Sequence, residues 1–162
     1  MVEEYFGVRL SSNLVVALPL TNVETVTRFK PKKVCPLPGV APFWLGIINQ
    51  QGSLLWVLDT DMFFELVVLK EEPQEDTLTA IVLSRKFQGS VVRVAWIVKK
   101  LEGVLSLPES YLESSHAKPL PSALKPKFEK VFPFTIEQRD RHLIVLDAAA
   151  FFETLNSQAL AV

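Results

Sequence analysis

The sequence predicts a mainly β protein built from two small barrels that pack against one another. Short runs rich in Val, Ile, Phe and Trp recur along the chain, and turn signals separate them. Several of these runs are apolar on both faces, and a short residue pattern occurs twice, once in each half. Many short strands that need cover on two sides are typical of barrels or sandwiches.

Ten segments have the composition and length of β-strands. Turn signals at Ser12-Asn13, Gln51-Gly52, Gln88-Gly89 and Arg139-Asp140 separate neighbouring segments and favour hairpins. The predicted strands are 5–10, 14–18, 23–29, 43–48, 54–58, 78–83, 91–98, 103–106, 130–136 and 142–146.

Two of these strands are apolar at every position or nearly so. The segments 14–18 and 79–83 do not alternate between apolar and polar residues. A strand whose two faces are both apolar must be covered on both sides. Two barrels packed together would provide that cover.

A weak internal repeat links the two halves. Segments 57–65 and 145–153 share V-L-D and then F-F-E at the same spacing. Each predicts a strand followed by a short helix, with Asp59 or Asp147 as the capping residue and the paired Phe residues folding onto a barrel. Two explanations fit this repeat: common ancestry of the halves, or the same strand-to-helix transition without common ancestry.

Polar, proline-containing stretches predict exposed connections. These are 70–76, which is acidic, and 113–121 together with 125–127, which are Pro-rich. Ser106, followed by Pro108, is a candidate N-cap for a brief helix.

Length and charge favour one domain, 1–162, with a sizeable core. The chain has 162 residues, a hydrophobic fraction of 49% and a net charge of −1, and its mean hydropathy is +0.25. Such a balance gives no attraction for phosphates or membrane surfaces, so nucleic acid and direct membrane insertion are not expected. Segment 34–58 carries no charge, but its prolines and amides interrupt it too often for a membrane helix. The start has no signal-peptide pattern and Cys35 is the only cysteine, which favours a cytoplasmic protein.

Patterns typical of enzymes are weak. His116 and His142 are the only imidazoles, and Ser115-His116 are neighbours in a predicted loop. A catalytic triad needs a nucleophile, a base and an orienting group within hydrogen-bond reach, and no nucleophile elbow is present. One Cys and two separated His do not make a zinc site, and no glycine-rich phosphate loop occurs. We therefore expect no metal, no cofactor and no catalysis, with Cys35 as a buried, inert thiol.

The central segment 38–59 resembles the signature of the CheW family, the coupling proteins of chemotaxis-type signalling. The segment carries P-G-x-x-P, then G-I-x-N-x-x-G, and closes on V-L-D. Weaker likeness extends to 23–26, 91–105 and 143–147, and so covers most of the chain.

This resemblance implies a fold of two five-stranded, SH3-like barrels with a hydrophobic seam. It implies a non-catalytic adaptor whose seam receives the helical cytoplasmic tip of a chemoreceptor and whose barrel ends dock the regulatory domain of a CheA-like histidine kinase. The pathway would be chemotaxis, phototaxis or type IV pilus motility, and self-association is possible. The alternatives are a CheW-fold module with another signalling partner and a small β-barrel hydrolase or ligand-binding protein.

The departures from the family pattern mark a specialised surface. Gln51 and Thr25 stand where the family usually has Arg and Glu, Lys99 stands where Asp is common, and Ala95 where Gly is common. We hypothesise that the Arg and Glu of typical members form a pair across the first barrel, and that its joint replacement here alters the receptor-facing surface.

Twelve residues are candidates for the receptor and kinase interfaces. The two glycines among them are at least as well explained by backbone conformation, and the aliphatic residues by core packing. Trp44 and Trp96 are candidates for partial exposure because indole is common in interfaces, although burial is the commoner fate. The interface candidates are Val23, Thr25, Gly46, Ile47, Ile48, Asn49, Gln51, Gly52, Val94, Ala95, Trp96 and Lys99.

Overall fold

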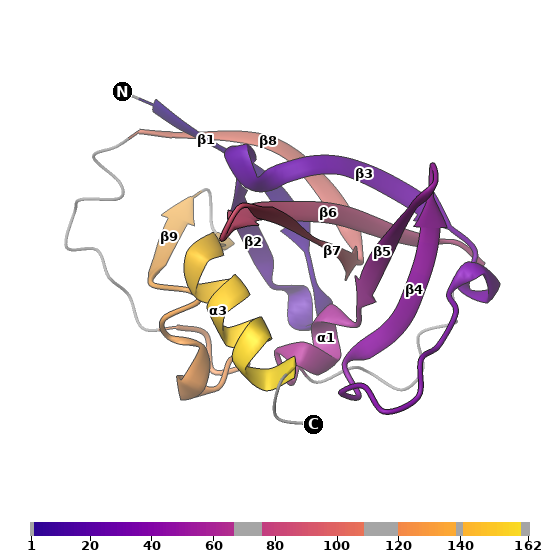
Figure 1. Ribbon diagram of the computed structural model, residues 1–162. Coiled ribbons are helices and arrows are strands. Elements are labelled where there is room, and N and C mark those ends of the chain that lie inside the picture. Colours follow the sequence, from indigo (N-terminus) through magenta and orange to yellow (C-terminus); the bar gives the residue numbers. More distant parts are fainter. Residues whose placement is uncertain (1, 67–75, 109–119, 139–140, 160–162) are drawn as a thin grey trace.

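The computed structural model describes residues 2–66, 76–108, 120–138 and 141–159. It is mainly β, with two curved five-stranded sheets that share one large core, to which two helices also contribute (Figure 1). The strands are β1 (Val2–Arg9), β2 (Val15–Pro19), β3 (Val23–Phe29), β4 (Trp44–Gln50), β5 (Ser53–Leu58), β6 (Leu78–Phe87), β7 (Ser90–Val98), β8 (Lys100–Pro108), β9 (Phe134–Gln138) and β10 (Arg141–Val145). The helices are α1 (Thr60–Phe63) and α3 (Ala148–Ala159), with short 3₁₀ turns η1 (Ser11–Asn13), η2 (Leu20–Asn22), η3 (Pro31–Lys33) and η4 (Pro126–Phe128).

The two sheets have related connectivity. The first has the order β8-β1-β2-β10-β9 and the second β3-β6-β7-β5-β4. Each is antiparallel except for one parallel pair, β10 with β2 and β5 with β7. The chain enters the first sheet, builds the second and returns to complete the first. This arrangement confirms the predicted mainly β fold with two β subdomains.

The strands that are apolar on both faces are covered on both sides, as predicted. In β2, Val16 and Leu18 belong to the large core between the sheets, whereas Val15 and Ala17 face a smaller core within the first sheet. In β6, Ile81 and Leu83 face the large core, and Ala80 and Val82 face a small core within the second sheet. Each subdomain therefore has its own small core, and both share the large one.

The motif phenylalanines close this shared core. Asp59 accepts a hydrogen bond from the backbone N–H of Met62 (3.1 Å), and Asp147 accepts one from Ala150 (3.0 Å). Both predicted N-caps are thus confirmed. The rings of Phe63 and Phe151 meet edge to face, with centroids 5.6 Å apart. The repeated motif therefore brings the two halves into contact.

Three local predictions are wrong. Ser106 does not cap a helix, because it lies in β8 opposite Glu4 of β1, and positions 109–112 lie outside the described residues. The strand predicted at 130–136 begins only at Phe134, because Pro133 lacks the N–H that a ladder needs. Cys35 is exposed instead of buried, since its backbone pairs with Ile47 at the edge of the second sheet and leaves the thiol outside.

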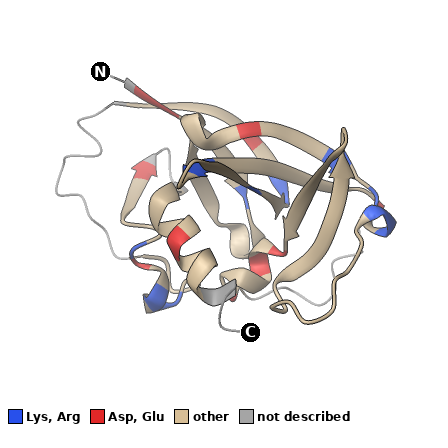
Figure 2. Ribbon diagram, viewed as in Figure 1, with Lys and Arg blue, Asp and Glu red and all other residues tan. Residues whose placement is uncertain are grey.

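The charged residues are spread over many elements. Figure 2 shows basic positions at η3 and η4 and acidic positions at β3 and on α3, with most of the ribbon uncharged. Within the part of the chain that the structure describes, no helix is long and apolar enough to cross a bilayer. Most of the exposed connection predicted at 70–76 and most of that predicted at 113–121 lie outside the described residues.

Candidate interaction surface

The β4–β5 turn presents the signature residues Asn49, Gln51 and Gly52 to solvent. Gln50 pairs with Ser53, so the loop is two residues long, and its φ angles are 51° at Gln51 and 85° at Gly52. Two positive φ angles define a type I′ turn, which suits the twist of a hairpin. The Asn49 side-chain oxygen accepts a hydrogen bond from the Gly52 N–H at 3.0 Å. Gly52 thus has the structural role that sequence reasoning favoured, within an exposed turn.

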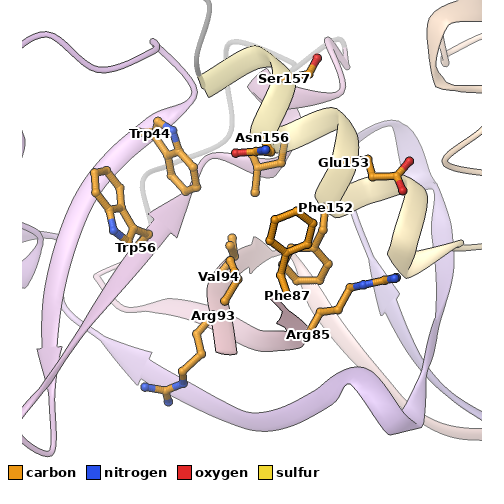
Figure 3. Close-up of a pocket in the computed structure, with 12 residues that line it drawn as sticks. Trp44, Trp56, Arg85, Phe87, Arg93, Val94, Phe152, Glu153, Asn156 and Ser157 are labelled. Atoms are coloured by element: carbon orange, nitrogen blue, oxygen red, sulfur yellow. The ribbon is translucent and has the colours of Figure 1, made fainter. Parts of the chain in front are cut away.

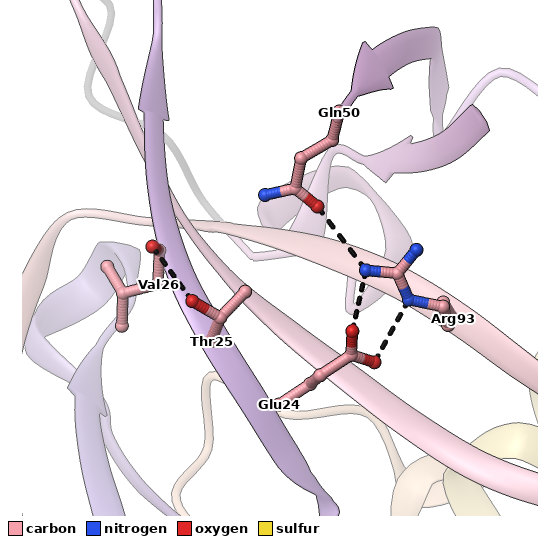
Figure 4. A network of polar contacts seen from close by, with 5 residues as sticks. All are labelled: Glu24, Thr25, Val26, Gln50 and Arg93. Atoms are coloured by element: carbon pink, nitrogen blue, oxygen red, sulfur yellow. Dashed lines mark hydrogen bonds and ion pairs between the residues drawn. The ribbon is translucent and has the colours of Figure 1, made fainter. Parts of the chain in front are cut away.

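A polar network holds this turn beside β3 and β7. The Arg93 guanidinium donates to one carboxylate oxygen of Glu24 through Nε at 2.9 Å. Its Nη2 lies 2.6 Å from the other carboxylate oxygen of Glu24. The same nitrogen donates to the Gln50 side-chain oxygen at 3.4 Å (Figure 4). We call Glu24, Gln50 and Arg93 the clasp. A bidentate Arg–carboxylate pair fixes geometry better than a single contact does.

Thr25 continues this surface along β3. Thr25 is exposed, and its hydroxyl donates to the Val26 carbonyl at 3.3 Å (Figure 4). Val26 is 36% exposed and lies on the opposite face of β3, which is an edge strand. We call the clasp, Thr25 and the turn 49–52 the clasp face.

Five of the predicted interface residues are buried: Gly46 and four apolar residues of the cores. Ile48 and Ala95 lie in the small core of the second sheet, and Val94 and Trp96 lie in the shared core, where Trp96 is fully buried. Trp44, by contrast, is half-buried. Of the two tryptophans proposed for partial exposure, only Trp44 has it.

Gly46 has a structural role. Its φ of +143° lies at a bulge in β4, and a Cβ there would stand 2.2 Å from the Cys35 carbonyl oxygen. Only glycine permits this close approach of two backbones. Gly46 is therefore explained by the pairing of β4 with Cys35, without a partner protein.

The remaining candidates are not gathered at one place. Val23 and Ile47 are half-buried, Val23 against the shared core and Ile47 beside Cys35. Lys99 is exposed, and its backbone N–H donates to the Arg9 carbonyl at 2.8 Å. It follows Arg93 by six residues along β7, about 20 Å at the rise of a strand. The clasp face thus unites Thr25, Asn49, Gln51 and Gly52 and leaves Lys99 apart.

Sequence reasoning missed all three clasp residues. It placed a neutralised pair at Thr25 and Gln51, whereas the structure has a charged pair one position away, at Glu24, with its cation on β7. The available signal was the lone Arg93 within the apolar run 91–98, since a charge inside such a strand requires a partner.

Enzymatic alternatives gain no geometric support from the described residues. His142 is exposed on β10, and Ser115 and His116 lie outside the described residues. In the described ranges, no three His, Cys, Asp or Glu side chains come together as a metal-binding group. The expectation of a protein without metal or cofactor stays a prediction.

Comparison with known proteins gives consistent matches. A family model described as CheW-like domain matches residues 4–156. Chemotaxis protein CheW of Bacillus subtilis is 27% identical over 144 residues, which cover 88% of this chain and 83% of the relative. The crystal structure of the scaffolding protein TtCheW from Thermoanaerobacter tengcongensis superposes with a TM-score of 0.68 at 18% identity, covering 91% of this chain and 90% of that one.

Proposed function

This chain belongs to the family of CheW-like domains, and from that membership we propose that it is a non-catalytic scaffold of a chemotaxis-type pathway. The observation that carries the proposal is the family match over residues 4–156, which includes both sheets and α3 up to Asn156. In this proposal the protein works in the cytoplasm and couples a chemoreceptor-type sensor to a CheA-like histidine kinase.

We assign the receptor contact to the clasp face. A helical tip needs an ordered surface to dock on, and the clasp face offers a bidentate ion pair beside the exposed turn 49–52. The Glu24–Arg93 pair is partly exposed, so it contributes little to stability. Its value lies in holding β3, the β4–β5 turn and β7 in a fixed relation, because an interface that is ordered before binding loses less entropy on association.

The departures at Thr25 and Gln51 support a specific receptor instead of a lost function. We hypothesise that typical members have a charged pair at positions 25 and 51. This chain has a charged pair close by, between Glu24 and Arg93, and so retains a charge-assisted contact beside the same turn. Whether the pathway serves chemotaxis, phototaxis or type IV pilus motility depends on which receptor carries the matching tip.

A matched pair of turns tests the assignment. Gln51-Gly52 and Gln88-Gly89 are both two-residue turns, and their φ angles are nearly the same, 51° and 85° against 50° and 81°. The test measures dissociation constants for a receptor-tip fragment and a kinase regulatory domain from the same genome, by biolayer interferometry. Gln51→Glu should weaken receptor binding about fivefold or more, because it adds an unpaired charge at the contact, and Gln88→Glu should change it less than twofold.

Two results would contradict the proposal at different levels. If neither fragment binds the unmodified protein at accessible concentrations, the adaptor function is wrong. If both fragments bind and the two substitutions weaken receptor binding equally, the adaptor stands but the clasp face is not the receptor contact.

A further inference from the structure

A groove on the other side of Arg93 has no role in the proposed function. It has a volume of about 490 Å³ and lies between α3 and strands β4 to β7 (Figure 3). That volume is within the range of small-molecule sites, about 300–1,000 Å³. The residues lining it are Trp44, Trp56, Arg85, Phe87, Val92, Arg93, Val94, Phe152, Glu153, Leu155, Asn156 and Ser157.

The groove exists because the β6–β7 hairpin extends beyond the shared core. Val94 is 2% exposed, whereas Val92, two residues nearer the turn and on the same face, is 39% exposed. Phe87 at the end of β6 is 48% exposed and Trp56 on β5 is 37% exposed. The apolar face that forms the core thus continues into solvent, with α3 as one wall.

Four aromatic residues line the groove. Trp44 and Trp56 stand together at one end, with ring centroids 5.1 Å apart and planes tilted by 60°. Figure 3 shows Phe87 and Phe152 toward the other end, with Val94 between the two aromatic pairs. Such a lining suits the apolar body of a ligand and gives it no preferred polar orientation.

Arg85 supplies a charge at the phenylalanine end. It is half-buried, and no hydrogen bond or ion pair to it is found among the described residues. Arg93, the other guanidinium in the lining, is matched by Glu24. Glu153 lines the groove too, but it is exposed, so solvent screens its charge. A half-buried cation beside apolar rings favours an anionic group there.

We propose that this groove binds small apolar carboxylates, with the hydrocarbon part against Trp44 and Trp56 and the carboxylate on Arg85. The site shares Arg93 with the clasp, but the proposed partner of the carboxylate is Arg85, so the proposal does not depend on the receptor assignment. The ligand class is a single carboxylate joined to an aryl or branched alkyl body.

The test uses three probes with one apolar body: 4-phenylbutyrate, 4-phenylbutan-1-ol and 4-phenylbutylamine. Calorimetry gives their affinities for the full chain, and tryptophan fluorescence reports on the groove, because Trp44 and Trp56 line it and Trp96 is buried. We expect the acid to bind about tenfold more tightly than the alcohol, since one charge-assisted hydrogen bond contributes that much, and the amine to bind least tightly.

The register of the β6–β7 hairpin provides matched variants. Arg85 pairs with Val92, and on the opposite face Lys86 pairs with Val91. Arg85→Gln should remove the difference between acid and alcohol, and Lys86→Gln should leave it. Val92→Glu places a carboxylate opposite Arg85 and should weaken the acid about tenfold by internal competition, whereas Val91→Glu should not.

Several results would overturn the proposal. It is wrong if the alcohol or the amine binds as tightly as the acid, or if the Lys86 and Val91 variants behave like the Arg85 and Val92 variants. It is also wrong if no probe binds and the kinase regulatory domain perturbs the fluorescence of the groove tryptophans instead, because the groove is then a protein interface.

Discussion

The two copies of the V-L-D…F-F-E pattern begin in the same way and end differently. In both, a strand leads into a helix capped by Asp59 or Asp147. Helix α1 ends after Phe63, whereas α3 continues to Ala159. Because α1 is short it remains within the shared core, and because α3 is long it becomes the wall of a groove.

Residues after the shared pattern decide where each helix ends. Glu65 adopts a left-handed φ of 55°, and the N–H groups of Glu65 and Leu66 donate to the carbonyls of Met62 and Asp61. This is a Schellman C-cap with Glu in the position that glycine usually occupies, and Glu65 also pairs with Lys127 of η4. The two halves thus repeat the start of the helix but not its length. The short helix α1 is a core element, and the longer helix α3 also forms part of the surface.

The largest expected effect tests whether the two copies share one core. Phe63 and Phe151 occupy equivalent positions, and they are 2% and 0% exposed. Replacement of either by Ala should cost about 3–5 kcal/mol of unfolding free energy, measured by urea denaturation. Phe134→Ala on the exposed face of β9 is the control, with an expected loss below about 1 kcal/mol.

The double variant sharpens that test. Since the two rings are in contact, their losses should be non-additive by about 0.5–1.5 kcal/mol. A loss at Phe151 below about 1 kcal/mol, or strictly additive losses, would mean that each helix serves its own half.

The bulges of the two sheets provide the next comparison. A Cβ at Gly46 meets the Cys35 carbonyl oxygen at 2.2 Å with φ at +143°, whereas a Cβ at Gly7 meets the Leu105 and Glu102 side chains at 3.0 and 3.1 Å. Backbone cannot move aside as a side chain can, so Gly46→Ala should cost about 2–4 kcal/mol and Gly7→Ala about 1 kcal/mol or less. Equal midpoints in chemical denaturation for the two variants would remove the role given to Gly46.

The smallest effect concerns pH at the two caps. Burial is the largest cause that raises the pKa of Asp59 above its ordinary value of 3.8, and nearby Asp61 adds to it, while the Met62 N–H and Lys99 lower it. The folded state therefore binds the proton more tightly than the unfolded state does. Stability associated with Asp59 falls as pH rises from about 4 through the raised pKa.

Asn at this position caps a helix without titrating. We therefore expect the stability of Asp59→Asn relative to the unmodified protein to improve between pH 4 and pH 7, in thermal or urea unfolding at a series of pH values. Asp147→Asn provides the baseline for replacing a capping carboxylate. A relative stability of Asp59→Asn that falls over this range would contradict the sign.

Much of the fold was predictable because buried short strands are recognisable from their runs of apolar residues. Segments 14–18 and 79–83 are apolar at every position except Thr79, and this alone indicated two layers of cover. Strand ends were less predictable: β8 extends to Pro108 because β1 offers partners down to Val2, and no property of 103–108 reveals that.

The interaction surface was less predictable than the fold. Arg93 and Glu24 are 69 positions apart, and their contact depends on how β3, β6 and β7 are ordered in the sheet. The groove likewise depends on the length of α3, which the repeated motif does not encode. Both surfaces depend on which strands are neighbours in the sheet, and the residue pattern along the chain does not specify the strand order.

Arg93 is the one side chain common to the clasp and the groove. A molecule that settles in the groove and turns this guanidinium away from Glu24 would alter the affinity of the clasp face for its partner. Thermodynamic reciprocity then requires the partner to alter the affinity of the groove by the same factor. The affinity of each surface would then depend on the position of a single arginine side chain.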